Sequence, residues 1–207
     1  MNFYTVNGSP NCRKVHAVIN YLELDVKIIE LGITSGELEA PEYRALNPNG
    51  MVPLLEDGDF KLWESNAITQ YLASLAPASS LYPDDPRIRA DIHRWQCWEE
   101  CHFNRACGEF LFENILKPML KIGEPDPAVL QEAEQNFMCF AAILEHQLEG
   151  RDFILGKDVT LADFSVGSMM VYADAAGIPL ASFKNISKWV HKMEGISAWA
   201  EVPALVA

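Results

Sequence analysis

The sequence predicts a small α+β domain followed by an all-helical domain. Strand and helix signals alternate over the first 76 residues, which is typical of a sheet covered by helices. After the proline-rich stretch "APASSLYPDDP" the sequence shows long helical patterns and no strand pattern. We therefore expect a first domain over residues 1–76, a linker over residues 77–86 and an all-helical domain over residues 87–207.

The first domain is expected to run βαβ and then ββα. Asp57-Gly58-Asp59 marks a hairpin turn, because Asp-Gly readily adopts the positive φ that tight hairpins need. The βαβ half implies a parallel strand pair with a right-handed crossover, and the hairpin adds an antiparallel edge. The expected strands cover residues 2–6, 26–31, 52–56 and 60–63, and the expected helices cover residues 11–24, 41–46 and 64–76.

The second domain is expected to contain four helical stretches. Residues 87–120 form one long helix or a bent pair, and others run from 126 or 127 to about 148, over 160–176 and over 185–195. In "VTLADF", Thr160 can cap the amide three residues on while Asp163 reaches back to the cap. We interpret this capping box as the structural start of a core helix.

Composition and charge exclude several functions. The 207 residues carry a formal net charge of −13, and both halves of the chain are acidic, which disfavours nucleic acids and anionic membrane surfaces. Without a signal-peptide pattern or an uncharged apolar run of about 18 residues, we expect a cytoplasmic protein. Five cysteines without a framework spacing indicate reduced thiols, and without a paired His spacing no metal site is expected.

Three stretches of the first domain could meet in space and form a binding site: the opening turn, which is described below, and two others. In "NPNGMVPLLEDGDF", Val52-Pro53 stands at a strand start, where a proline without an amide proton is tolerated. A cis bond there would leave the Val52 backbone to pair with a peptide-like ligand; an ordinary trans proline is the alternative. In "WESNAI", free amides at Ser65 and Asn66 can accept a carboxylate, and Glu64 an ammonium. The alternative is that Ser65 only caps its helix.

Together these stretches resemble the cytosolic glutathione transferases, of bacterial type. "NPNGMVPLLEDGDFKLWESNAITQYLA" resembles the glutathione-binding core of that family, and "VTLADFSVG" resembles its C-terminal capping motif. The resemblance implies an α+β thioredoxin-like N-terminal domain (βαβ-ββα) followed by an all-α C-terminal domain. It also implies a homodimer with glutathione as co-substrate and no metal.

The resemblance assigns ligand contacts to individual residues. Val52 and cis-Pro53 would pair with the cysteinyl backbone of glutathione, and Glu64 and Ser65 would hold its γ-glutamyl head. Met51 would lie against glutathione where many members place Gln or Lys.

The glycyl carboxylate of glutathione lacks an obvious partner in this sequence. Phi-like members carry basic residues near the positions of Leu38 and Glu39, neither of which is basic here. Arg13 or a residue of the other subunit is therefore expected to bind this carboxylate.

The opening turn "NGSPNCRKV" offers a hydroxyl, an amide and a thiol. Ser9 stands where glutaredoxins carry the first cysteine of Cys-Pro-x-Cys, and is similar to the activating serine of theta-like and phi-like classes. A hydroxyl that donates to sulfur stabilises the thiolate, so Ser9 is the expected catalytic donor. Asn11 is a second candidate, as in the Thr-Pro-Asn turn of nu-class members. Cys12 is expected to be a buried, inert thiol; a mixed disulfide there is the alternative.

"WEECHF" resembles a Glu-x-His pattern of beta-class members, where both side chains approach glutathione. Glu100 and His102, with Phe103, are candidates for a cross-subunit or acceptor site, although a solvated Glu and an ordinary helical His explain the pattern equally well.

The leading function is transfer of glutathione to a hydrophobic electrophile. The alternatives are a glutathione-dependent disulfide reductase or peroxidase of nu-like type, and a non-enzymatic binding module.

Overall fold

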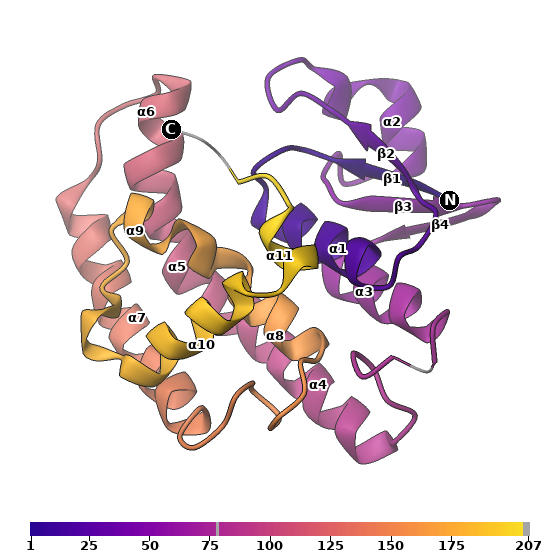
Figure 1. Ribbon diagram of the computed structural model, residues 1–207. Helices are drawn as coiled ribbons and strands as arrows, with labels where there is room; N and C mark the ends of the chain where they lie inside the picture. Colours follow the sequence, from indigo (N-terminus) through magenta and orange to yellow (C-terminus); the bar gives the residue numbers. More distant parts are fainter. Residues whose placement is uncertain (78, 205–207) are drawn as a thin grey trace. The chain divides into compact units, whose positions relative to one another are not determined.

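The computed structural model describes residues 1–77 and 79–204, which divide into two compact units (Figure 1). The first unit is Met1–Pro83 together with the segment that begins at Ser197, and the second is Asp84–Ile196. The expected helical domain over residues 87–207 thus loses its C-terminal segment to the first unit. The reason is a packing contact, since α11 (Ser197–Ala200) lies against α1 (Pro10–Tyr21).

The first unit is a four-stranded sheet with the strand order β2-β1-β3-β4. β1 is parallel to β2, and β3 is antiparallel to both β1 and β4, which confirms the βαβ and ββα halves. The strands are β1 (Asn2–Thr5), β2 (Lys27–Glu30), β3 (Leu54–Asp57) and β4 (Phe60–Trp63), and the remaining helices are η1 (Glu37–Glu39), α2 (Pro41–Leu46) and α3 (Ser65–Ser74).

The core of this unit lies between the sheet and helices α1 and α3, which pack against each other. Apolar side chains recur at helical spacing on the inner face of each helix and meet the buried side chains of the central strands. The fully buried members include Phe3, Leu55, Val15, Val18, Ile68 and Leu72.

The register of the sheet brings three chain segments to the same end of its strands. Tyr4 pairs with Leu54, and Leu54 pairs with Trp63. β1 ends, β3 begins and β4 ends within a residue of these pairs. The turn after β1, the peptide before β3 and the helix start after β4 therefore leave the sheet at the same end. These are the three stretches that the sequence marks as site-like.

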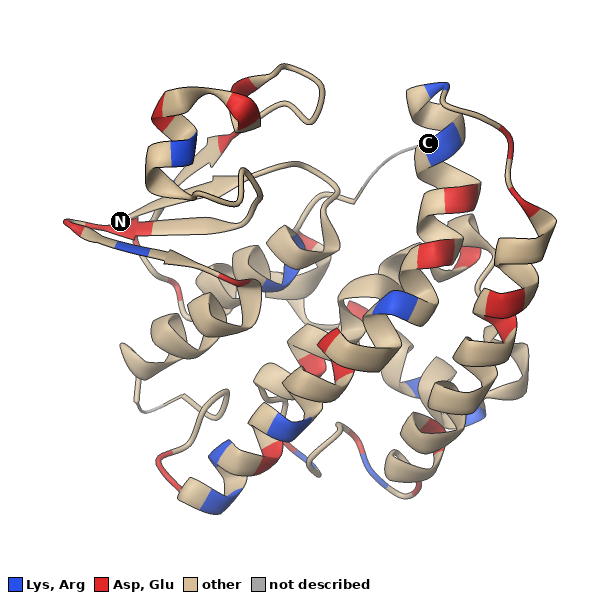
Figure 2. Cartoon of the chain, turned by 180° about the vertical axis from the view of Figure 1, so that it is seen from behind, with Lys and Arg blue, Asp and Glu red and all other residues tan. Residues whose placement is uncertain are grey.

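The second unit is helical. The predicted long helix over residues 87–120 is a continuous path with two π-helical turns, along which Lys and Arg positions are interleaved with Asp and Glu (Figure 2). In the described part of the chain, no helix combines the length and apolar character needed to cross a membrane. The elements are α4 (Pro86–Trp98), η2 (Glu99–Phe103), α5 (Asn104–Leu111), η3 (Phe112–Leu116), α6 (Lys117–Leu120), α7 (Pro127–Gln147), α8 (Leu161–Val166), η4 (Gly167–Tyr172), α9 (Ala173–Ala176), η5 (Leu180–Ser182) and α10 (Lys184–Glu194).

The predicted capping box starts α8. The backbone N–H and the hydroxyl of Thr160 donate to the Asp163 carboxylate over 2.9 and 3.1 Å. The backbone N–H of Ile154 and the indole N–H of Trp189 donate to its other oxygen over 2.8 and 3.0 Å. Asp163 is fully buried, and this burial raises its pKa to about 6. The structural interpretation of "VTLADF" is therefore confirmed.

Candidate active site

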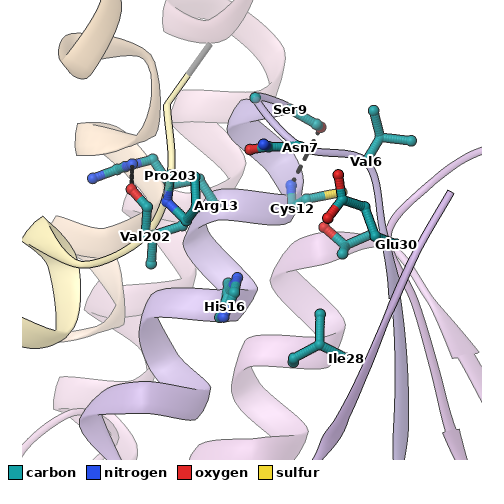
Figure 3. Close-up of a pocket in the computed structure, with 12 residues that line it drawn as sticks. Val6, Asn7, Ser9, Cys12, Arg13, His16, Ile28, Glu30, Val202 and Pro203 are labelled. Atoms are coloured by element: carbon teal, nitrogen blue, oxygen red, sulfur yellow. Dashed lines mark hydrogen bonds between the residues drawn. The ribbon is translucent and has the colours of Figure 1, made fainter. Parts of the chain in front are cut away.

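Ser9 occupies the N-cap of α1, at the end of the turn that follows β1. Gly8 has a φ of 80°, which a glycine adopts without steric cost, and Pro10 begins the helix, where a missing amide proton costs nothing. The Ser9 oxygen accepts the backbone N–H of Cys12 over 3.3 Å (Figure 3). A hydroxyl has one proton and two lone pairs, so this bond fixes the oxygen while the proton stays available for donation.

Cys12 is almost completely buried behind this turn. Burial raises the pKa of its thiol, although contacts with the Val6 backbone and with the side chains of Ser9 and Thr5 act in the opposite direction. A thiol with a raised pKa is protonated at neutral pH and is a poor nucleophile. The geometry therefore favours Ser9 over Cys12 as the chemically active group of the turn.

A small pocket with a cavity volume of about 50 Å³ opens beside Ser9 (Figure 3). Asn7 lines it, whereas Asn11 is exposed on the first turn of α1. Sequence reasoning missed Asn7, although it lies in the same turn, because a turn amide carries no sign of the direction in which it points. Val202 and Pro203 also line the pocket, and no local signal marks them.

The Val52-Pro53 peptide bond is cis, as the family resemblance implies, and the alternative of an ordinary trans proline is wrong. β3 begins at Leu54, so the Val52 peptide lies outside the strand ladder at the sheet edge. The preceding carbonyl of Met51 accepts the Tyr43 hydroxyl and the Asn47 side-chain amide, both over 2.7 Å. The Met51 side chain is 66% exposed, so it offers an apolar surface and no cation.

Glu64 precedes α3 and has a φ of 73°, a conformation that costs a non-glycine residue about 1–3 kcal/mol and is found at functional sites. Its side chain is exposed and makes no capping hydrogen bond to α3. Ser65 is buried and is the first residue of the helix rather than its N-cap. The alternative in which Ser65 caps the helix is therefore wrong.

Arg13 does not face a ligand. It is 5% exposed, and its two terminal nitrogens donate to the carbonyl oxygens of Val202 and Trp199, each over 2.6 Å. The expectation that Arg13 binds the glycyl carboxylate is corrected accordingly, because the C-terminal segment takes the donors that the carboxylate would need.

Glu100, His102 and Phe103 lie in the second unit, on the π-helical turn η2. Glu100 and His102 are exposed, and the His102 ring stacks on Phe140 at a centroid distance of 5.1 Å. Phe103 is fully buried and stacks on Trp98. Phe103 is thus a core residue, and its assignment to an acceptor site is corrected. Across residues 1–77 and 79–204, no group of three or more His, Cys, Asp or Glu side chains is arranged to hold a metal ion.

Comparisons with known proteins match both parts of the chain. Residues 3–80 match the family model "Glutathione S-transferase, N-terminal domain", and residues 127–201 match "Glutathione S-transferase, C-terminal domain". The chain is similar to a glutathione S-transferase of Hyoscyamus muticus, with 30% identity over 93% of this chain and 92% of that protein. It is also similar to glutathione S-transferase 3 of Zea mays, with 32% identity over 79% of this chain and 73% of that protein.

The chain is also similar to a solved structure. The theta class glutathione S-transferase from Xanthomonas axonopodis pv. citri, solved with glutathione bound, has 29% identity and a TM-score of 0.88 over 99% of this chain and 97% of that chain. The agreement covers both units, the cis-proline strand start and the capping box lie within the matched ranges, and the curated relatives match over most of their own length. The chain therefore belongs to the glutathione S-transferase family.

Proposed function

We propose that this chain binds glutathione at the edge of its sheet and transfers it to a hydrophobic electrophile. One observation carries the proposal: the β1–α1 turn with Ser9, the cis Val52-Pro53 peptide and the Glu64-Ser65 helix start leave the sheet at the same end. A peptide with an α-amino acid head and a thiol matches these three features.

Each feature suits one part of glutathione. The Val52 peptide outside the ladder suits the cysteinyl backbone, because an extended peptide pairs with strand-edge groups. The exposed carboxylate of Glu64 suits the γ-glutamyl ammonium, and the first amides of α3 with Ser65 suit its carboxylate. Met51 supplies contact surface without charge, so the glycyl carboxylate would rely on a residue of the partner subunit.

Ser9 is the residue that would activate the sulfur of glutathione. Its free proton would donate to the glutathione sulfur and stabilise the thiolate, with the exposed Asn11 amide as a second donor. A decrease of two pKa units corresponds to about 2.7 kcal/mol, and one hydrogen bond to a charged group contributes about 1.5–3 kcal/mol. The activated sulfur then forms a bond to an electrophilic carbon, either by addition or by displacement of a leaving group that departs with its electron pair.

The proposal includes a homodimer and a cytoplasmic location. Glu100 and His102 are exposed on η2 and are the groups that we expect to approach the partner's glutathione. All five cysteines are free, which suits a reducing compartment.

Calorimetric titration with glutathione, together with turnover of 1-chloro-2,4-dinitrobenzene, tests the proposal. We expect binding at millimolar glutathione or below and formation of the aryl conjugate. The absence of binding would contradict the proposal. Turnover of a small disulfide without aryl transfer would contradict it in favour of the reductase alternative.

A further inference from the structure

Arg13 joins α1 to a segment that is far away in sequence. Its terminal nitrogens bind the carbonyl oxygens of Val202 (Figure 3) and Trp199, and its guanidinium lies over the Trp199 ring at 4.7 Å. Trp199 belongs to α11 and Val202 follows that helix, so both carbonyls are acceptors at a helix end, where intrahelical partners run out. A buried guanidinium that is hydrogen-bonded to such acceptors fixes both elements, because breaking the contact removes two hydrogen bonds from a buried charge.

The segment that Arg13 holds also forms a wall of the pocket beside Ser9. Val202 and Pro203 line this pocket together with Ser9, Cys12 and Arg13 itself (Figure 3). Val202 is 5% exposed, so its side chain has a defined place. The position of the wall therefore depends on the Arg13 contacts.

The pocket lies on the side of Ser9 that is opposite to the proposed glutathione contacts. In the strand order β2-β1-β3-β4, the Val52 peptide precedes β3 and Glu64 follows β4. Ile28 and Glu30, which line the pocket, belong to β2. A group in the pocket would thus meet the sulfur at Ser9 from the β2 side.

The chemistry of the walls favours a small uncharged group. Ile28, Val202 and Pro203 are apolar, and the opposite charges of Glu30 and Arg13, which both line the pocket, leave it without a net charge that would attract an ion. His16 also lines the pocket, and burial together with the nearby Arg13 charge lowers its pKa, so it is neutral at neutral pH. A cavity of about 50 Å³ leaves room for a few atoms only.

We propose that Arg13 is a positioning residue, which holds Val202 and Pro203 as a wall that limits the size of the electrophile reaching the sulfur. This inference rests on the proposed function. It gives the C-terminal segment a role in selecting the second substrate, whereas glutathione binding stays with the opposite side of the sheet.

Kinetics of Arg13→Met and Arg13→Lys test the inference, with Asn20→Ala as the matched control. Asn20 also lies on α1 and donates to the same segment, at Ala198, over 3.5 Å, but does not line the pocket. We expect Arg13→Met to raise the KM for the electrophile about tenfold, the range that small changes in an apolar pocket produce. The KM for glutathione should stay within about twofold, and Arg13→Lys should recover part of the loss because it restores one charged donor.

Substitutions of Val202 keep the inference testable if Arg13→Met does not fold. The ratio of kcat/KM for phenethyl isothiocyanate to that for the smaller allyl isothiocyanate should rise about tenfold in Val202→Ala and fall in Val202→Phe. Unchanged ratios in both variants, with glutathione binding intact, would overturn this inference and leave the proposed function standing. An equal effect of Asn20→Ala and Arg13→Met would also overturn it. Failure of the unsubstituted protein to bind glutathione would overturn both.

Discussion

The backbone N–H of Cys12 donates to the hydroxyl oxygen of Ser9 over 3.3 Å. This bond makes the serine the N-cap of α1 and uses only a lone pair of its oxygen. The backbone N–H of Cys12 orients the hydroxyl oxygen, while the Cys12 thiol is buried and Ser9 is half-buried. The division of roles between these neighbours can be tested residue by residue.

Ser9→Ala should raise the pKa of bound glutathione by about 1–2 units, since one hydrogen bond to a charged group is lost. At neutral pH, kcat/KM should fall by about 10- to 100-fold. Thiolate absorbance against pH measures the shift. Ser9→Thr, which keeps the hydroxyl and the cap, is the control and should retain most of the activation. An unchanged pKa in Ser9→Ala would remove Ser9 from its role.

Cys12→Ala should leave transferase turnover within about twofold, because a buried thiol with a raised pKa takes no part in the reaction. In the native protein, Cys12 should react with an iodoacetamide probe more slowly than the exposed thiols of Cys97 and Cys139. Peptide mass spectrometry over a time course gives both rates. Loss of turnover in Cys12→Ala, with activity retained in Ser9→Ala, would move the chemistry to the thiol.

Glu64→Gln should raise the Kd for glutathione about tenfold, since a charge-assisted hydrogen bond to the ammonium becomes a neutral one. Glu23→Gln is a matched control, because Glu23 is also exposed and has a positive φ of 51°. Glu23 lies beyond the C-terminal end of α1, whereas Ser9 lies at its N-terminal end. Calorimetry of both variants reports the difference. Equal Kd values for the two variants would argue against a ligand contact at Glu64.

Asp163 should make the stability of the protein depend on pH in an unusual direction. Its folded-state pKa, about 6, lies above the ordinary aspartate value of 3.8, so the folded state binds the proton more tightly. The stabilisation is complete below about pH 4 and is lost as the pH rises through about 6. Relative to Asp163→Asn, which does not titrate, the free energy of unfolding should fall by about 3 kcal/mol from well below pH 4 to well above pH 6.

Urea denaturation of both proteins across this pH range measures the effect. Asp158→Asn removes the same charge from an exposed position nearby and should reproduce the pH profile of the unsubstituted protein. A difference between native protein and Asp163→Asn that does not change with pH would show that Asp163 stays ionised among its four donors.

The sequence predicts those parts of the structure that local chemistry decides. The strand over residues 60–63 and the helix over residues 41–46 occur with the predicted bounds, because turn residues fix their ends. The first helix stops at Tyr21 rather than at residue 24, since Glu23 takes a left-handed conformation that its residue type does not announce. The turn at Ser9 and the helix start near Glu64 follow from the same local signals, whereas the cis Val52-Pro53 bond is implied by the family resemblance and not by the residues alone.

The contacts that the sequence does not reveal are long-range ones. Arg13 and its acceptors are 186 and 189 residues apart, and a basic residue in a motif gives no sign of whether it faces a ligand or a carbonyl. Phe103 is similar, because an aromatic residue on a helix has the same pattern whether it lines a pocket or a core. Only the packing separates these possibilities.

The contacts between Arg13 of α1 and the segment from Trp199 to Val202 also determine when, during synthesis, the first unit can be completed. A ribosome adds about 5–20 residues per second, so roughly 10–40 s separate the emergence of Arg13 from that of its carbonyl acceptors. From the completion of β4 until that segment emerges, the face of α1 that α11 covers is without its cover, although the sheet beneath α1 is already complete. The first unit to be translated is therefore the last to be finished, and a fragment cut at the linker would carry this uncovered face permanently.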